Sequence, residues 1–187
     1  MYKGSDPNSE YSASRLKLLQ YNWLMRTYIT PVKLNRFNSD NSDLCYKCNQ
    51  EKGTLFHCLW ACGKIHDFWK EVSHMIFKMV SVQLPLHPKI FILGLYPPNL
   101  HIDNKAKPLI DMCLLQAKRQ IALNWKNTIR PNIGQWLREM SLSLSMERIT
   151  YTVRGKYGTF KEVWGPFINY IENSDVGDIL AAEVSLD

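Results

Sequence analysis

The feature that most constrains this chain is a cysteine-rich run, CYKCNQEKGTLFHCLWAC, at residues 45–62. Cys45 and Cys48 are separated by two residues, so both sulfurs can turn toward one ion, because the intervening pair folds into a tight knuckle. Gly53 permits the chain reversal that brings a second pair of ligands back to the first. A segment so short and polar buries too little surface to order itself. We therefore expect a metal ion to supply the missing folding energy.

Cys62 belongs to the second pair of ligands, and its partner is His57, Cys58 or His66. On an uninterrupted α-helix His57 and Cys62 lie about 140° apart, whereas Cys58 and His66 each share a face with Cys62. If His57 is the ligand, the segment before Cys62 must turn or break. Four protein ligands with no open position are typical of one structural zinc ion, not a catalytic one. In the absence of metal, the cysteines would pack as small apolar groups.

The remaining sequence predicts a mainly α fold, namely a small helical domain with a Cys3His zinc knuckle (residues 45–62) inserted between helices. Apolar residues recur at helical spacing, and no strand-like alternation of useful length is present. The expected helices cover residues 14–28, 31–37, 64–82, about 104–126, 132–151 and 159–172. The clearest apolar face consists of Ile65, Phe68, Trp69, Val72, Met75, Ile76 and Met79. Pro131 ends the long fourth helix.

Composition divides the chain into five parts. They are a disordered leader (1–12), helices that flank the knuckle (13–82), a Pro-rich connector (83–103), a basic helical region (104–173) and an acidic tail (174–187). No stretch approaches the roughly 20 apolar residues of a membrane span, and the N-terminus lacks the apolar run of a secretory signal. We expect an intracellular protein with no membrane partner, in the nucleus or in a cytoplasmic ribonucleoprotein.

The net charge of +6 is concentrated in one block. Residues 104–161 contain 11 Lys or Arg and 3 Asp or Glu, whereas residues 162–187 contain 6 Asp or Glu and no Lys or Arg. A basic block suits a polyanionic partner, although a solvated helix face has the same composition. The candidate phosphate contacts are Lys47, Lys52, Lys64, Lys118, Arg119, Lys126, Arg130, Arg138, Arg148, Arg154 and Lys156. Tyr46 either stacks on an unpaired base or packs against the knuckle.

Nothing in the sequence predicts a catalytic centre. Cys113 has no histidine near it in sequence to act as a base, so we expect it to be a core thiol. Asp67 and Glu71 lie four residues apart on a predicted helix, where like charges are usually solvated. No glycine-rich phosphate-binding loop is present. We therefore expect a binding protein, not an enzyme.

Several blocks, in the same order, resemble the C-terminal segment of the second-open-reading-frame polyprotein of LINE-type (non-LTR) retrotransposons, which follows the reverse transcriptase. The blocks are LMRTYITPVKLNRF, LCYKCNQEKGTLFHCLWACGKIHDFWKEV, FILGLYP, AKRQIALNWK and MERITYTVRGKYGTFKEVWGPFINYI. The resemblance as a whole covers the stretch from roughly Arg15 to Phe167, about four fifths of the chain.

The resemblance implies that Cys45, Cys48, His57 and Cys62 are the family's zinc ligands, and so favours His57 over Cys58. It also implies that the segment binds RNA or assists target-primed reverse transcription. As partners we expect RNA or DNA, the element's own RNA first, and retrotransposon or host ribonucleoprotein proteins. The sequence lacks the YxDD-type aspartate pair of a reverse transcriptase and the apurinic-endonuclease-like region. Those two activities are therefore not expected of this chain.

Overall fold

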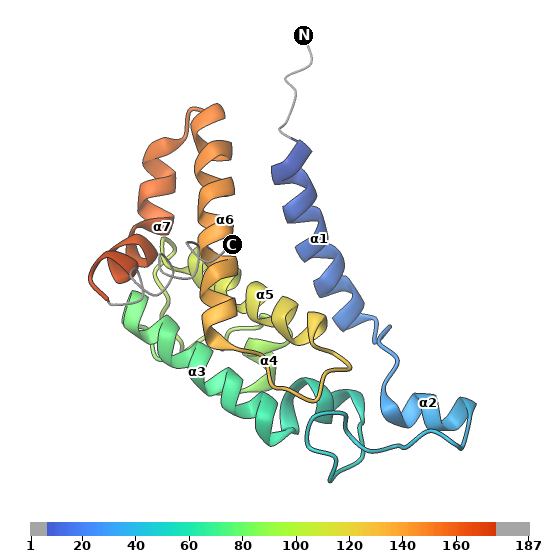
Figure 1. The fold of residues 1–187 in the computed structure, drawn as a ribbon. Coiled ribbons are helices and arrows are strands. Elements are labelled where there is room, and N and C mark those ends of the chain that lie inside the picture. The colour runs from blue at the N-terminus through green and yellow to red at the C-terminus, as the bar shows by residue number, and fades with distance from the viewer. Residues whose placement is uncertain (1–6, 175–187) are drawn as a thin grey trace.

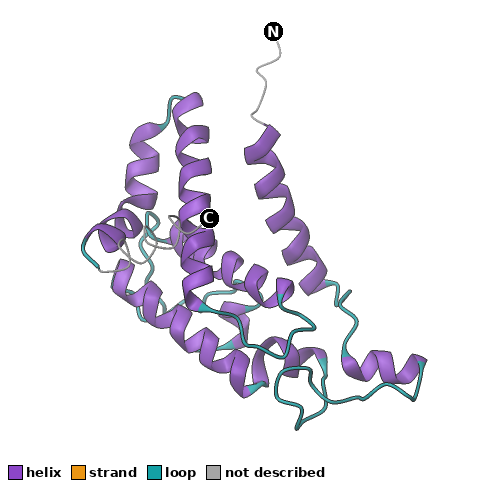
Figure 2. Ribbon diagram, viewed as in Figure 1, coloured by secondary structure: helices purple, strands orange, loops and turns teal. Residues whose placement is uncertain are grey.

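The computed structural model describes residues 7–174, with side chains from Leu16 onward, and confirms the mainly α prediction. The described residues form no β-strand, only an antiparallel bridge between Leu44 and Lys52 (Figure 2). The elements are α1 (Pro7–Leu24), α2 (Pro31–Phe37), the π-turn η1 (His57–Ala61), α3 (Gly63–Val80), α4 (Pro88–Phe91), α5 (Lys107–Leu123), α6 (Ile133–Val153) and α7 (Tyr157–Glu172). In Figure 1, α1 and the α6–α7 pair rise from a base of α3, α4 and α5.

Helix α3 is buried along the face that its sequence pattern predicts. The side chains of that face that are at most 1% exposed are Ile65, Phe68, Trp69, Val72 and Ile76. Burial of each such side chain contributes about 1.5–3 kcal/mol. The helix packs against α5 and α7, and it ends where Ser81 adopts a left-handed conformation with φ 55°. The core thus fixes α3, and with it Cys62 at the N-terminal end of the helix.

The helical regions on either side of residues 83–103 share one core. Helix α5 packs against α1, α3, α6 and α7. Across the α5–α6 contact, the Trp136 indole N–H donates to the Cys113 carbonyl at 3.0 Å. Gln116 donates to the Ser143 hydroxyl at 2.7 Å in the same contact. Cys113 is 1% exposed and so is a core thiol, as predicted.

The segment at 83–103 is more than a connector, because it contains α4 and contributes to the core. Pro88 is placed at the start of α4, where a missing N–H costs nothing. Leu84, Ile90 and Phe91 are buried. The Phe91 ring meets Trp69 edge-on, with centroids 5.4 Å apart. From the sequence, only a Pro-rich connector was predicted here.

Several helix boundaries differ from those predicted, including the end of α1, which lies at Leu24 instead of Tyr28. Helix α1 begins at Pro7, so residues 7–12 of the predicted disordered leader are helical, with the proline in the first turn. The rest of that leader and nearly all of the acidic tail lie outside the described residues. Helix α5 ends at Leu123, before Lys126, because the Asn124 side chain donates to the Gln120 carbonyl at 2.9 Å and competes with the helix. No described helix is long and apolar enough to cross a membrane.

Candidate metal centre

The structure brings together the four predicted ligands Cys45, Cys48, His57 and Cys62. Their ligand atoms all lie within 4.8 Å of one another. The Sγ atoms of Cys45 and Cys62 are 3.9 Å apart, and Cys48 Sγ is 3.4 Å from His57 Nε2. In a tetrahedral zinc site, the usual bond lengths place two sulfurs about 3.8 Å apart and a sulfur and a nitrogen about 3.6 Å apart. The cluster therefore has the dimensions to hold one metal ion.

The first two ligands are held by a short turn with its own backbone hydrogen bonds. The Cys45 N–H donates to the Glu51 carbonyl at 2.8 Å, and the Asn49 N–H donates to the Cys45 carbonyl at 2.9 Å. Asn49 adopts a left-handed conformation with φ 52°, which asparagine tolerates better than most residues. The turn thereby points the Cys45 and Cys48 sulfurs to the same side.

A π-turn resolves the geometric conflict between His57 and Cys62. An α-helix would place these side chains far apart around its axis, but the residues from His57 to Ala61 form a π-helix. In that conformation the N–H of one residue bonds to the carbonyl five residues earlier, and Cys62 N–H meets His57 O at 2.9 Å. The wider turn places the Cys62 side chain on the same side of the helix axis as the His57 side chain. The predicted break before Cys62 is thus a π-turn.

Cys58 and His66, the alternatives to His57, are not part of the ligand cluster. The Cys58 side chain is hydrogen-bonded to Cys45, and this bond, together with burial, raises the pKa of the Cys58 thiol. The same bond lowers the pKa of Cys45 to about 4. Cys58 therefore remains a protonated thiol that donates a hydrogen bond to Cys45, one of the candidate metal ligands. The His66 ring meets Trp60 edge-on, at 5.3 Å between centroids.

His57 is oriented by contacts on both sides of its ring. The residue is buried, and while Nε2 faces Cys48, Nδ1 lies 3.2 Å from a carboxylate oxygen of Glu51. A carboxylate at the outer ring nitrogen favours the tautomer whose other nitrogen is free to bind metal. The His57 backbone N–H donates to the Thr54 hydroxyl at 3.1 Å. The role of Glu51 could not be predicted from the sequence, because nothing in its spacing identifies it.

Lys47 is buried inside the knuckle, so its predicted role as a phosphate contact is wrong. It is 6% exposed, and its ammonium donates to the carbonyls of Asn124 at 2.6 Å and Asn127 at 3.0 Å. Burial lowers the pKa of Lys47, and the neighbouring cysteines oppose that shift. Three thiolates, one neutral imidazole and a divalent ion carry a net charge of −1. With such an ion bound, the Lys47 ammonium would offset this buried charge.

Gly53 has a different role from the one predicted. The left-handed residue of the turn is Asn49, whereas Gly53 lies against α2. A Cβ atom at Gly53 would lie 2.4 Å from Cγ of Pro31, well inside van der Waals contact. Gly53 O also accepts a hydrogen bond from Val32 at 3.4 Å. The glycine is therefore required for close approach of the knuckle to α2.

Gly53→Ala is expected to destabilise the protein by about 1–3 kcal/mol, because the Pro31 ring and the knuckle must move apart. Urea denaturation measures the change in the free energy of unfolding. Gly63→Ala is the matched control, because a Cβ there meets no atom within 4 Å. Similar unfolding free energies for the two variants would show that the contact with Pro31 carries no cost.

The other predicted basic residues fall into three groups. Lys118 is 3% exposed and donates to Gln20 at 2.6 Å, so it also is wrong as a phosphate contact. Others are already paired: Arg119 with Glu139, Arg130 with Glu71 at 2.8 Å, and Arg138 with Gln135. The remaining six residues are all exposed, namely Lys52, Lys64, Lys126, Arg148, Arg154 and Lys156.

The exposed basic residues do not form one patch. Lys52, Lys64 and Lys126 surround the knuckle, and the Lys64 ammonium donates to the Thr128 carbonyl at 3.2 Å. Arg154 and Lys156 lie in the turn between α6 and α7, which Figure 1 shows at the other end of the molecule. The basic block defined by the sequence is therefore split between two ends of the fold.

The chain matches no known protein-family model.

Proposed function

We propose that this chain is a zinc-stabilised nucleic-acid-binding accessory module, with RNA as its ligand and no catalytic centre of its own. Three cysteine sulfurs and one imidazole form a soft donor set that suits zinc. The four ligands leave no open coordination position for a substrate or a reactive water, so the ion has a structural role. The separations among the ligand atoms support this assignment.

Nucleic-acid binding is supported chiefly by the exposed cations around the knuckle. The side chain of Lys52 is 76% exposed and lies 3.4 Å from Asp43, a weak surface pair that a phosphate can replace. Lys64 and Lys126 are also exposed. The resemblance to the LINE-type polyprotein segment favours RNA, the element's own first, and a site of action in nuclear or cytoplasmic ribonucleoproteins.

The test is the salt dependence of binding to a fluorescent single-stranded RNA. With three phosphate contacts, the logarithm of the binding constant falls against the logarithm of the salt concentration with a slope of about −2. This slope corresponds to a roughly 20-fold loss of affinity between about 50 and 200 mM salt. The triple variant Lys52→Ala, Lys64→Ala and Lys126→Ala should lose most of that slope. Lys118→Met, which removes a buried cation, should leave it unchanged. Absence of binding at low salt with an intact fold would overturn the proposal.

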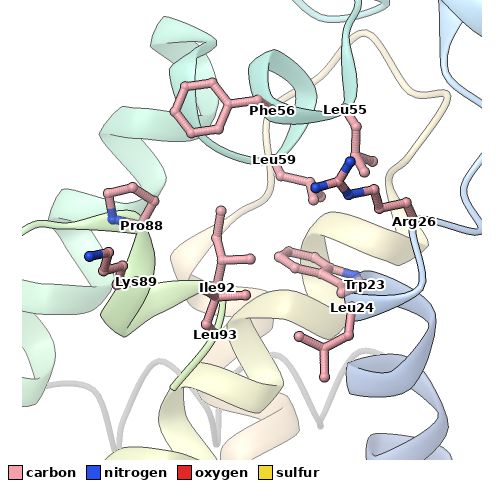
Figure 3. Close-up of a pocket in the computed structure, with 10 residues that line it drawn as sticks. All are labelled: Trp23, Leu24, Arg26, Leu55, Phe56, Leu59, Pro88, Lys89, Ile92 and Leu93. Atoms are coloured by element: carbon pink, nitrogen blue, oxygen red, sulfur yellow. The ribbon is translucent and has the colours of Figure 1, made fainter. Parts of the chain in front are cut away.

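A second candidate function, a protein-interaction scaffold with purely structural zinc, is favoured by an apolar groove. The groove has a volume of about 470 Å³, between the end of α1, the segment that leads into η1, and α4. Figure 3 shows Trp23, Leu24, Phe56, Leu59 and Ile92 around this space. Leu24 is 50% and Phe56 56% exposed. Exposed apolar surface of this kind is common at protein interfaces.

A further inference from the structure

A second pocket lies beside the knuckle and differs in chemistry from the apolar groove. Its volume is about 390 Å³, and the residues that matter here are Asn22, Thr27, Tyr28, Tyr46, Trp125 and Lys126. They come from the end of α1, the link to α2, the knuckle and the segment after α5. Figure 1 shows these segments at the end of the molecule that carries the knuckle. We call this site the aromatic pocket.

Three aromatic rings line the aromatic pocket, and the structure fixes two of them. Tyr28 and Trp125 are in contact, with centroids 4.8 Å apart and planes inclined at 46°. The Trp125 indole N–H donates to the Ile29 carbonyl at 2.9 Å, which holds the ring in place. In the sequence, Tyr46 lies between Cys45 and Cys48, so the turn that holds these two candidate metal ligands also positions the Tyr46 ring. All three rings are only partly buried, which leaves surface on which a planar ligand can stack.

The polar groups of the aromatic pocket restrict the class of ligand further. The Asn22 side chain offers a donor and an acceptor. The Thr27 hydroxyl donates to the backbone carbonyl of Asn22 at 3.3 Å and can still accept a hydrogen bond from a ligand. Lys126 is exposed at the rim. Among the described residues that line the pocket, none is acidic. The complementary ligand is therefore planar, with hydrogen-bonding edges and a negative charge close to the ring.

An unpaired nucleotide has these properties. We propose that the aromatic pocket receives one unpaired base of a single-stranded nucleic acid against Tyr46 and Trp125, with the adjoining phosphate at Lys126. Stacking on exposed aromatic rings and contact with a nearby cation are the usual means of binding single strands without sequence preference. This inference rests on the proposed nucleic-acid function and assigns it a site.

The experiment compares a single-stranded RNA octamer with an octamer of the same backbone that carries abasic residues throughout. Loss of one stacked base should weaken binding to the wild-type protein by about 5- to 150-fold. Tyr46→Leu should weaken binding of the normal octamer by a large part of that factor, because only Trp125 remains, and should leave binding of the abasic octamer unchanged. Tyr46→Phe keeps the ring and should stay within about twofold of wild type. Tyr21→Leu, which removes an exposed ring outside the pocket, is the matched control.

The outcomes separate this proposal from the proposed function. Salt-dependent binding that is equal for the two octamers, or unaffected by Tyr46→Leu, overturns the aromatic pocket and leaves nucleic-acid binding in place. No binding by the wild-type protein overturns both. Zinc content and circular dichroism check that Tyr46→Leu is folded, and the comparison of octamers on wild-type protein needs no variant. Displacement of the octamer by an acidic, aromatic-containing peptide that binds more tightly would identify a protein ligand instead, and would also overturn the proposal.

Discussion

Cys48→Ala is expected to abolish stoichiometric zinc binding and to unfold the knuckle, while the α3–α5–α6–α7 core remains helical. Structural zinc in small domains contributes about 10–16 kcal/mol at neutral pH, so each of four ligands accounts for roughly 3 kcal/mol, or about a hundredfold in affinity. On the proposed zinc assignment the fold of the knuckle depends on the metal, whereas the core rests on side chains such as Trp69 and Trp136, both 0% exposed. Native mass spectrometry and hydrogen exchange over residues 43–62 measure the two effects.

Cys58→Ala is the matched control for this prediction. Cys58 is adjacent to His57 and hydrogen-bonded to Cys45, but it lies outside the ligand cluster. The variant should therefore keep one zinc ion per chain, whereas His57→Ala should lose it. The reverse result would make Cys58 the third ligand. If neither wild type nor any variant binds zinc, and chelator leaves the thermal stability of wild type unchanged, the metal assignment is wrong.

Lys118→Met is expected to stabilise the protein at neutral pH by about 1–2 kcal/mol. Burial lowers the pKa of Lys118 to about 8 from 10.5, against a weaker opposing effect of Asp111. That shift corresponds to roughly 3 kcal/mol of destabilisation whenever the amine is charged in both states. Methionine removes the charge and keeps most of the volume, but it leaves the Gln20 oxygen without the 2.6 Å bond, which offsets part of the gain.

The pH dependence distinguishes this electrostatic cost from a packing effect. Between about pH 8 and 10.5 the unfolded chain still holds the Lys118 proton that the folded chain has released, so the unfolding free energy of wild type rises with pH in that range. The advantage of Lys118→Met should therefore shrink as the pH rises and be lost near pH 10.5. Lys126→Met, at an exposed position, should show no such trend. A variant that is less stable than wild type at every pH would mean that the buried ammonium is net stabilising.

The sequence predicted the helices well where a helix buries one clear stripe. The apolar pattern of α3 recurs in its buried face, where Trp69 is 0% exposed. It could not predict α4, because four helical residues are too few to show a period. The start of α1 was placed late because the polar residues after Pro7 show no apolar stripe.

The ligand set was only partly predictable. The spacing of Cys45 and Cys48 indicated one ion, but the partner of Cys62 depends on a π-turn, which has no sequence signature. Packing around the π-turn fixes it, including a hydrogen bond from the Trp69 indole to the Leu59 carbonyl at 2.9 Å. The burial of Lys47 and Lys118 was equally invisible, because each lysine bonds to a residue at least 77 positions away. Charge counted along a sequence does not show which amines reach water.

The long-range bonds of Lys47 have a consequence for the order in which the protein takes shape during synthesis. All four metal ligands lie within residues 45–62, so they leave the ribosome long before Asn124 and Asn127 do. A nascent chain can thus load its ion early, while the Lys47 amine still has only water as a partner. The carbonyls that later receive this amine become available some 77 and 80 residues further along the chain. On the proposed zinc assignment, metal capture and docking of the knuckle would therefore be separate events in time, and docking would require the residues that follow α5.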